Sequence, residues 1–298
     1  MEIVIGFLLA IILFFVVVMV VDGNRFVIRE YTIESDKIKE EQTLVVLADL
    51  HNKKYGSNNE KLVKAIEKVN PDMVLAAGDI LTAKQGKSFE AAAAFMEAVS
   101  SKFPVYYGLG NHEYRMKIYP EDYKDAFDRY INRLKKAGII VLDNEKIEIR
   151  IQRKNAAESE EDFFTLRITG ASIERLYYKR FRKVKMEESY LKGLLGNPKK
   201  EAYEILLAHN PEYFDEYAAW GADLVLSGHV HGGIMRLPIF GGVISPKLVL
   251  FPKYDGGRFD KKDSTMILSR GLGMHTLPIR IFNPAELVVV HLLPCKSK

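Results

Sequence analysis

The sequence predicts an α/β protein in which two β-sheets pack together and helices cover their outer surfaces. In the first half of the chain, short continuous apolar runs alternate with stretches of helical spacing, a pattern typical of parallel strands buried on both faces. The second half is richer in strands, which supplies a second sheet. A third feature, an uncharged apolar segment at the N-terminus, lies outside this α/β pattern.

The N-terminal segment Ile3–Val21 contains no charged or polar side chain. At about 1.5 Å per residue, it is just long enough to cross a hydrocarbon core of roughly 30 Å. Nothing basic precedes it and no small-residue cleavage site follows it. We therefore expect a transmembrane anchor over residues 1–24 and one domain over residues 25–298.

The sidedness of this anchor is read from the charges that flank it. Four basic residues follow the span, namely Arg25, Arg29, Lys37 and Lys39. They favour a membrane protein whose domain lies on the cytoplasmic face. An ordinary signal anchor would place the domain outside, and the sequence leaves both alternatives open.

The composition is that of an ordinary globular protein. The chain has 298 residues, of which 48% are hydrophobic and 28% charged, and a formal net charge of +4. This mild basicity gives no reason to expect a nucleic-acid partner. Cys295 is the one cysteine, so disulfide frameworks and cysteine-based zinc sites are excluded.

The first half contains four predicted strands and three predicted helices. The strands are expected at Phe26–Ile33, Thr43–Leu47, Asp72–Ala77 and Pro104–Leu109, and the helices at Asn58–Val69, Ser88–Ser100 and Glu121–Lys136. The last helix is amphipathic and is expected to stop at Gly138.

The second half contains a predicted strand pair, Ile147–Ile151 with Phe164–Ala171, joined by the exposed connection Asn155–Asp162. The stretch Ser172–Lys200 is expected to be helical in part. The remaining elements are strands at Glu204–Leu207, Ala222–Leu226, Met266–Leu268 and Glu286–Leu292, and a helix at Glu212–Trp220.

Residue types that bind metals follow five of these predicted strands. They are Asp49 and His51, Asp79, Asn111 with His112, His209, and His229 with His231. A single histidine or aspartate at a strand end is more often structural, but ligands in α/β sheets bind beyond the carboxyl ends of strands, where all five groups would meet. Mixed nitrogen and oxygen ligands suit divalent Mn, Fe or Zn. Because the ligands are too many for one tetrahedral ion, we expect two metal ions, with Asp79 as a natural bridge.

These motifs also carry a resemblance to a known family. Asp49-x-His51, Gly78-Asp79, Gly110-Asn111-His112-Glu113, His209 and Gly228-His229-x-His231 resemble, in order and context, the calcineurin-like metallophosphoesterases. The resemblance implies a four-layer αββα sandwich of two mixed sheets flanked by helices, with a dinuclear metal centre. It implies that one ion takes Asp49, His51, Asp79 and His231, and that the other takes Asp79, Asn111, His209 and His229. His112 is implied to be the catalytic residue that meets the substrate, either stabilising the transition state or protonating the leaving oxygen.

One position departs from the family pattern. The second motif of the family usually continues Gly-Asp-x-x-Asp, whereas Thr82 stands here at the place of the second aspartate. That aspartate is not a metal ligand in the family, so its loss affects the support of the ligands. The Thr82 hydroxyl could partly replace it.

The expected function is hydrolysis of a phosphodiester or pyrophosphate bond, with manganese or a similar metal as cofactor. The N-terminal anchor and the C-terminal stretch Leu277–Leu287 resemble the membrane-anchored bacterial phosphodiesterase and pyrophosphatase branch, which implies a lipid-linked substrate. The alternatives are a nuclease or cyclic-nucleotide phosphodiesterase with the same site, or a weakly active metal-binding scaffold.

Three further features could each have a functional role or an ordinary structural one. The basic run Lys179–Lys185, preceded by two tyrosines, is a solvated helix face, a patch that faces membrane or phosphate, or a nucleic-acid contact. Arg236 is either a phosphate-binding residue or a surface arginine, and His275 is either part of the site rim or a turn residue.

Overall fold

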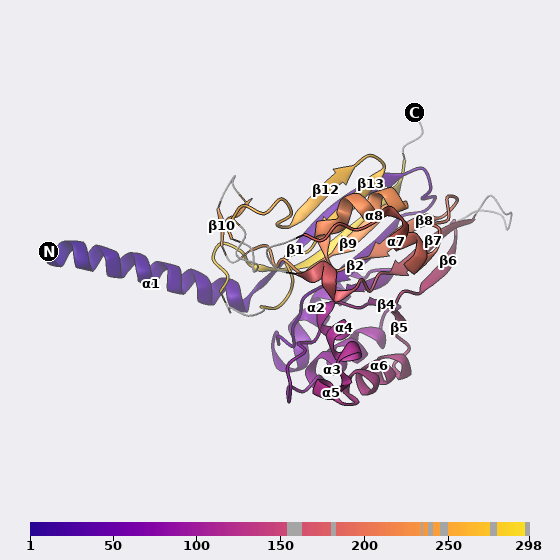
Figure 1. The fold of residues 1–298 in the computed structure, drawn as a ribbon. Helices are drawn as coiled ribbons and strands as arrows, with labels where there is room; N and C mark the ends of the chain where they lie inside the picture. The colour runs from indigo at the N-terminus through magenta and orange to yellow at the C-terminus, as the bar shows by residue number, and fades with distance from the viewer. Residues whose placement is uncertain are drawn as a thin grey trace.

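Two large β-sheets face each other in the computed structural model, and helices cover the outer face of each (Figure 1). The structure describes residues 1–153, 163–179, 183–233, 235–237, 241–244, 250–274 and 279–295. The predicted connection Asn155–Asp162 and His275 lie outside these residues.

The first sheet contains six strands in the spatial order β1-β14-β2-β3-β4-β5. Strands β2 to β5 run parallel to one another, β14 is antiparallel to β2, and β1 is parallel to β14. The bounds are β1 (Phe26–Ser35), β14 (Ala285–Pro294), β2 (Gln42–Leu47), β3 (Met73–Ala77), β4 (Val105–Gly108) and β5 (Ile140–Leu142).

The second sheet has the spatial order β12-β13-β9-β8-β7-β6. Its four central strands are parallel, and the strand at each edge is antiparallel to its neighbour. The bounds are β12 (Gly257–Lys261), β13 (Ser264–Leu268), β9 (Leu224–Ser227), β8 (Tyr203–Leu207), β7 (Phe163–Gly170) and β6 (Lys146–Gln152). A small hairpin pairs β10 (Arg236–Leu237) with β11 (Gly241–Gly242).

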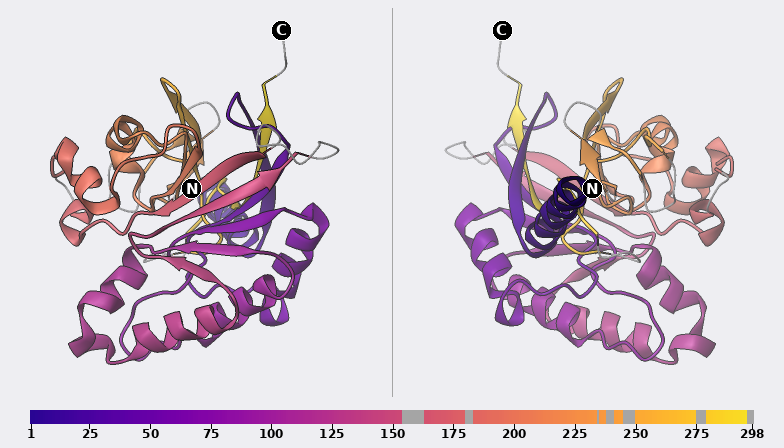
Figure 2. Two further views of the ribbon diagram at one scale, coloured as in Figure 1. Left: turned by 90° about the vertical axis from the view of Figure 1, so that its right-hand side faces the viewer. Right: turned by 90° about the vertical axis from the view of Figure 1, so that its left-hand side faces the viewer.

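Helices of the first half cover the first sheet and those of the second half cover the second (Figure 2). Around the first sheet lie α2 (Glu60–Val69), α3 (Glu90–Ser100), α4 (Asn111–Ile118), α5 (Pro120–Tyr123) and α6 (Ala126–Lys136). Against the second lie α7 (Glu188–Leu195) and α8 (Phe214–Trp220), with 3-10 turns η1 (Ser57–Asn59), η3 (Arg175–Tyr178) and η4 (Pro211–Tyr213) elsewhere in the chain.

Alternate residues of each central strand belong to different cores. Val46 and Leu75 of the first sheet pack with Ile205 and Leu226 of the second, and together they fill the space between the sheets. The neighbouring residue Val45 faces the opposite way, toward the helices. Strands buried on both faces need continuous apolar runs, as the sequence has. The predicted αββα sandwich of two mixed sheets is therefore confirmed.

Helix α1 (Glu2–Asn24) extends away from the sandwich (Figure 1), with its N-terminal part exposed and Asp22 and Gly23 buried at its C-terminal end. The helix has 23 residues, and an 18-residue window within it has a mean hydropathy of 3.5, so α1 is long and apolar enough to cross a membrane. The predicted apolar segment Ile3–Val21 is thus helical throughout.

One predicted helix was wrong in its extent. The expected helix Glu121–Lys136 is divided into α5 and α6, because Lys124 has a φ of 54°, which a continuous right-handed helix does not allow. The prediction also omitted α4, which begins directly after β4 and carries His112.

Candidate metal centre

The metal-type side chains meet where strands of both sheets end. From the first sheet, Asp49 and His51 follow β2, Asp79 follows β3, and Asn111 and His112 begin α4 after β4. From the second sheet, His209 follows β8, and His229 and His231 follow β9. Seven of these eight side chains lie together at this end of the sandwich, and Asn111 directly precedes His112 at the start of α4.

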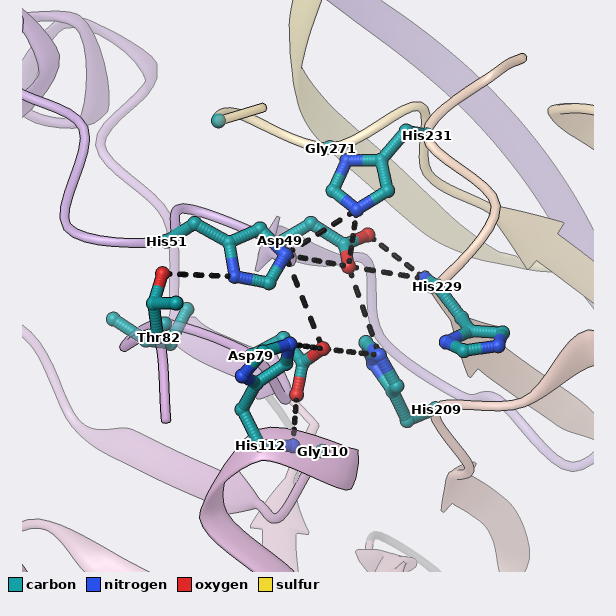
Figure 3. A network of polar contacts seen from close by, with 12 residues as sticks. Asp49, His51, Asp79, Thr82, Gly110, His112, His209, His229, His231 and Gly271 are labelled. Carbon is teal, nitrogen blue, oxygen red and sulfur yellow. Dashed lines mark hydrogen bonds and ion pairs between the residues drawn. The ribbon is translucent and has the colours of Figure 1, made fainter. Parts of the chain in front are cut away.

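Asp79 lies at the centre of the group. Its Oδ2 atom is 3.1 Å from His209 Nε2, 3.9 Å from His51 Nε2 and 3.9 Å from His112 Nε2. Figure 3 shows these rings directed at the Asp79 carboxylate from three different segments. One carboxylate is therefore within reach of ligands from both sheets.

Asp49 forms a second focus beside Asp79. Its Oδ1 atom is 3.5 Å from His231 Nε2, 3.6 Å from His209 Nε2 and 3.7 Å from His51 Nε2. The Nε2 atoms of His51 and His231 are only 3.2 Å apart, and their rings are stacked at 5.0 Å. Two imidazoles that direct nitrogens at each other and at a carboxylate are arranged as ligands around a cation.

The donor atoms fall into three overlapping groups in which all atoms lie within 4.8 Å of one another. The groups are Asp49, His51 and His231; Asp79, His209 and His229; and His51, Asp79 and His112. The Oδ1 atom of Asn111 is buried and accepts no hydrogen bond from the described part of the chain. A buried acceptor of this kind calls for a cation or another donor, so the residues fit a divalent metal.

Five of these residues have left-handed backbone conformations, which non-glycine residues rarely adopt. The φ angles are 51° at Asp49, 50° at His51, 54° at Asp79, 77° at His229 and 52° at His231. Such conformations cost on the order of 1–3 kcal/mol each and persist where surrounding contacts enforce them. One such contact is the His229 N–H, which donates to both carboxylate oxygens of Asp49 at 3.1 and 2.9 Å.

Two glycines allow the loops to approach this closely. A Cβ atom at Gly228 would lie 2.4 Å from Asp49 Oδ2, and one at Gly110 would lie 2.2 Å from Asp79 Oδ1. Neither aspartate could keep its place beside a larger residue. The glycines in the Gly110-Asn111-His112 and Gly228-His229 motifs thus make room for the carboxylates.

Backbone hydrogen bonds fix the ring nitrogens of two histidines in opposite ways. His209 Nδ1 lies 2.7 Å from the Ala77 carbonyl oxygen, so it must donate, and Nε2 of the neutral ring carries a lone pair toward Asp79. His112 Nδ1 instead accepts from the Ala83 N–H at 2.8 Å. The proton of a neutral His112 ring is therefore on Nε2, which makes Nε2 a hydrogen-bond donor and not a ligand atom.

The charges of the site favour a cation. Burial raises the pKa of Asp49 to about 7, although the neighbouring His209 opposes this shift. Burial lowers the pKa of His209, but the charges of Asp79 and Asp49 outweigh it and raise this pKa to about 10. In the absence of metal, a proton on His209 thus balances the carboxylates, and a bound cation would take its place.

Glu113 is a functional residue of the site whose role the sequence interpretation missed. It is completely buried, and its carboxylate accepts hydrogen bonds from the N–H groups of Asp79 and Gly110, each at 3.0 Å. It also accepts from the Ile80 N–H at 3.0 Å and the Tyr107 hydroxyl at 2.7 Å. The sequence did contain a feature that predicts this role: Glu113 stands three residues after Gly110, and a glutamate three residues after a helix cap commonly accepts from the cap N–H.

The remaining sequence-flagged residues lie around the site or away from it. Thr82 Oγ1 lies 3.4 Å from His51 Nδ1, so the hydroxyl contacts a proposed ligand. Tyr178 packs edge-on against His229 at 5.1 Å. Arg236 is not the expected surface arginine, because only 13% of its side chain is exposed; it donates to the Asp255 carbonyl at 2.7 Å and pairs with the Asp255 carboxylate at 3.1 Å. Lys183, in the described part of the basic run, pairs with Glu216.

A two-sheet αββα sandwich with carboxylates and histidines clustered at its strand ends defines an α/β protein with a candidate metal centre. The family model for calcineurin-like phosphoesterases matches residues 43–233 of the chain. The chain belongs to this family and is a metal-dependent phosphoric ester hydrolase.

Relatives are found in bacteria and animals. An uncharacterized metallophosphoesterase of Aquifex aeolicus is 27% identical over 268 residues, which cover 88% of this chain and 90% of the relative. One from Campylobacter jejuni is 26% identical over 274 residues, covering 89% and 63%. A transmembrane protein with a metallophosphoesterase domain from Danio rerio is 28% identical over 250 residues, covering 82% of this chain and 51% of that protein.

Proposed function

We propose that the protein is a membrane-anchored phosphoesterase with two divalent metal ions, and that it hydrolyses a phosphodiester or pyrophosphate bond of a lipid-linked substrate. The observation that carries this proposal is the convergence of donors from both sheets on Asp79 and Asp49. The proposed division of the chain is an anchor over residues 1–24 and a catalytic domain over residues 25–298. Arg25 and Arg29 favour the cytoplasmic face.

The proposed ligand sets are those that the family resemblance implies, and two of the three donor groups fall within them. One ion would be held by Asp49, His51, Asp79 and His231, and the other by Asp79, Asn111, His209 and His229. Two divalent ions, Mn, Fe or Zn, would supply the Lewis acidity that activates water and neutralises charge on the phosphoryl oxygens. The carboxylate of Asp79 would hold the two sets together.

His112 is proposed to act on the substrate rather than on a metal. The Ala83 N–H occupies its Nδ1 atom, so the Nε2–H is directed into the site 3.9 Å from Asp79. That N–H would donate to a phosphoryl or leaving-group oxygen and stabilise the charge that develops there. The geometry thus supports the hydrogen-bonding alternative of the two roles expected for this residue.

The first test separates this role from metal binding. His112→Ala is expected to lower kcat on bis-p-nitrophenyl phosphate with Mn²⁺ by about 10²- to 10³-fold, the typical effect of removing one such donor, and to leave the metal content unchanged. His209→Ala is the matched control and should lose metal as well as activity. Wild-type protein that is loaded with metal but hydrolyses neither diesters, monoesters nor pyrophosphates would contradict the proposed function. A panel of lipid pyrophosphates, glycerophosphodiesters and nucleotides, tested in detergent, would identify the substrate class.

Metal affinity is expected to weaken as the pH falls. Above about pH 7, binding must release the proton of His209, whose pKa is about 10, and below it binding must also release the proton of Asp49, whose pKa is about 7. As the pH is lowered, the apparent metal affinity should therefore fall about tenfold per pH unit in the range above pH 7, and about a hundredfold per unit well below pH 7. Equilibrium dialysis with Mn²⁺ from about pH 6 to about pH 8 measures this slope. An affinity independent of pH would show that neither group gives up a proton to the metal.

A further inference from the structure

One face of the anchor helix packs on the catalytic domain instead of standing free. Phe15, Val18 and Met19 are half-buried, and Asp22 and Gly23 are buried, whereas the rest of α1 is exposed. These five positions recur every three or four residues, so they form one stripe along the helix. The domain therefore covers the C-terminal half of α1 on one side.

Phe282, in the loop before β14, contacts α1 near the N-terminal end of this stripe. Its ring lies 6.3 Å from the ring of Phe14 and 6.2 Å from that of Phe15. The φ of Phe282 is 54°, an unusual conformation for a bulky residue, and 41% of its surface is exposed. The loop thus carries an aromatic ring that is only partly covered and that contacts the rings of α1.

The length of α1 fixes the depth of this ring. Phe15 precedes Val21 by six residues, or about 9 Å along the helix axis. The apolar segment Ile3–Val21 has almost no length to spare for crossing a hydrocarbon core of roughly 30 Å. If α1 spans the bilayer, Phe14 and Phe15 lie inside the apolar layer, and the ring in contact with them lies there too.

A second pair of exposed apolar residues belongs to the same end of the domain. Backbone hydrogen bonds connect Ile281 to Arg236 at 3.0 Å, Met235 to Val243 at 2.9 Å, and Val243 to Phe251 at 2.9 Å. Strand β10, which contains Arg236, lies near the end of α1 in Figure 1. At the far end of this series of hydrogen bonds, Leu250 is 64% exposed and Phe251 is 59% exposed.

The loop that carries Phe282 is also bonded to the metal centre. The side-chain nitrogen of Asn283 donates to the carbonyls of His231 at 2.8 Å and Gly233 at 2.7 Å. The Asn283 N–H donates to Asp22 of α1 at 3.0 Å. One residue therefore connects the anchor to the backbone of a proposed metal ligand.

We propose that the loop carrying Phe282 enters the bilayer beside α1 and holds the metal centre at the level of the lipid head groups. This inference rests on the proposed membrane anchoring and deepens it, because it gives the chain a second contact with the membrane. The partner is the lipid of the membrane that α1 crosses. Arg25 and Lys53 lie at the end of α1, near the level of the lipid phosphates: Arg25 pairs with Asp22 at 2.8 Å and keeps 54% of its side chain exposed, and Lys53 donates to Asn24 at 3.0 Å. A phosphate ester carried by a lipid would then reach the site without leaving the bilayer.

Depth-dependent fluorescence quenching tests this proposal on the full chain. In a Cys295→Ser background, single cysteines at Phe282 and Phe251 are labelled with bimane, and the protein is reconstituted in vesicles of phosphatidylcholine and phosphatidylglycerol that contain doxyl-labelled acyl chains. Ile118→Cys is the matched control, since Ile118 is apolar and 37% exposed but lies on α4, away from the anchor. Leu13→Cys, in α1, reports on the anchor itself.

We expect lipid quenching at Phe282 to be several-fold stronger than at Ile118, and quenching at Phe251 to exceed that of the control as well. Quenching at Leu13 with none above the control at Phe282 would overturn the loop proposal and leave the anchor intact. No quenching at Leu13 would overturn the membrane anchor and the loop proposal together. A blue-shifted label at Phe282 without lipid quenching would show that protein, such as a second copy of the chain, covers the ring, and would also overturn the proposal.

Discussion

Replacing Asp79 with alanine is expected to abolish phosphodiester hydrolysis and to remove both metal ions at the concentrations that saturate the wild-type protein. The reason is its central position, with Oδ2 3.1 Å from His209 and 3.9 Å from His51. Loss of an outer hydrogen-bond partner typically costs roughly 10- to 100-fold, so loss of a carboxylate common to both ligand sets should exceed about 10³-fold in kcat. Activity on bis-p-nitrophenyl phosphate and metal content by elemental analysis measure the two effects.

Single histidine variants provide the comparison that makes this prediction specific. His231→Ala and His229→Ala should each lose one ion and retain the other, because the two residues belong to different donor groups. Asp79→Asn is the matched control for folding. The side-chain oxygen of an asparagine can still accept from the backbone N–H of His112, as Asp79 Oδ1 does at 2.8 Å. An Asp79→Asn protein that keeps two ions and full activity would refute the bridging role.

The metal-type residues could be predicted from sequence because their positions depend on strong local patterns. The apolar run of β2 makes a parallel strand that is buried on both faces, and whatever follows it, here Asp49 and His51, must emerge at the carboxyl edge. The same holds for Asp79 after β3 and His209 after β8. Residue type and strand direction together were sufficient to bring these side chains to one place.

The supporting contacts could not be predicted in this way. The Ala83 N–H that fixes the His112 ring is a backbone group, and no residue type marks it. Asn283 supports His231 from 52 positions further along the chain, through a contact that depends on tertiary structure. The division between α5 and α6 rests on one residue, Lys124, in a conformation that its side chain does not favour. In each case the determining feature is either a backbone group or conformation, or a contact between residues far apart in the chain. The local pattern of apolar residues predicts neither.

Thr82 shows how a departure from the family pattern can be interpreted once the contacts are known. The missing aspartate raised the expectation of weaker ligand support. In the structure, the Thr82 hydroxyl lies 3.4 Å from His51, and the next residue along the chain supplies the N–H that fixes His112. The segment after Asp79 therefore contacts both histidines without a second carboxylate.

Glu113→Ala is expected to lower the free energy of unfolding by about 3 kcal/mol or more, because three buried backbone N–H groups lose their acceptor. The carboxylate is fully buried and accepts from the N–H groups of Asp79, Ile80 and Gly110, which have no water to bond to instead. Each N–H group left unpaired in the interior costs about 1–3 kcal/mol of stability, so the loss of the acceptor for several of them should give a large decrease. Urea denaturation of the metal-free protein measures the change without interference from metal binding.

Tyr107→Phe is the matched control, because it removes one hydroxyl donor from the same carboxylate and leaves the backbone donors paired. It should cost only about 0.5–1.5 kcal/mol, the net value of a typical hydrogen bond. If Glu113→Ala destabilises the protein no more than Tyr107→Phe does, the carboxylate does not hold the Asp79 loop. If the large difference is observed, metal affinity in Glu113→Ala should fall as well, since the carboxylate fixes the left-handed backbone that presents Asp79 to both ligand sets.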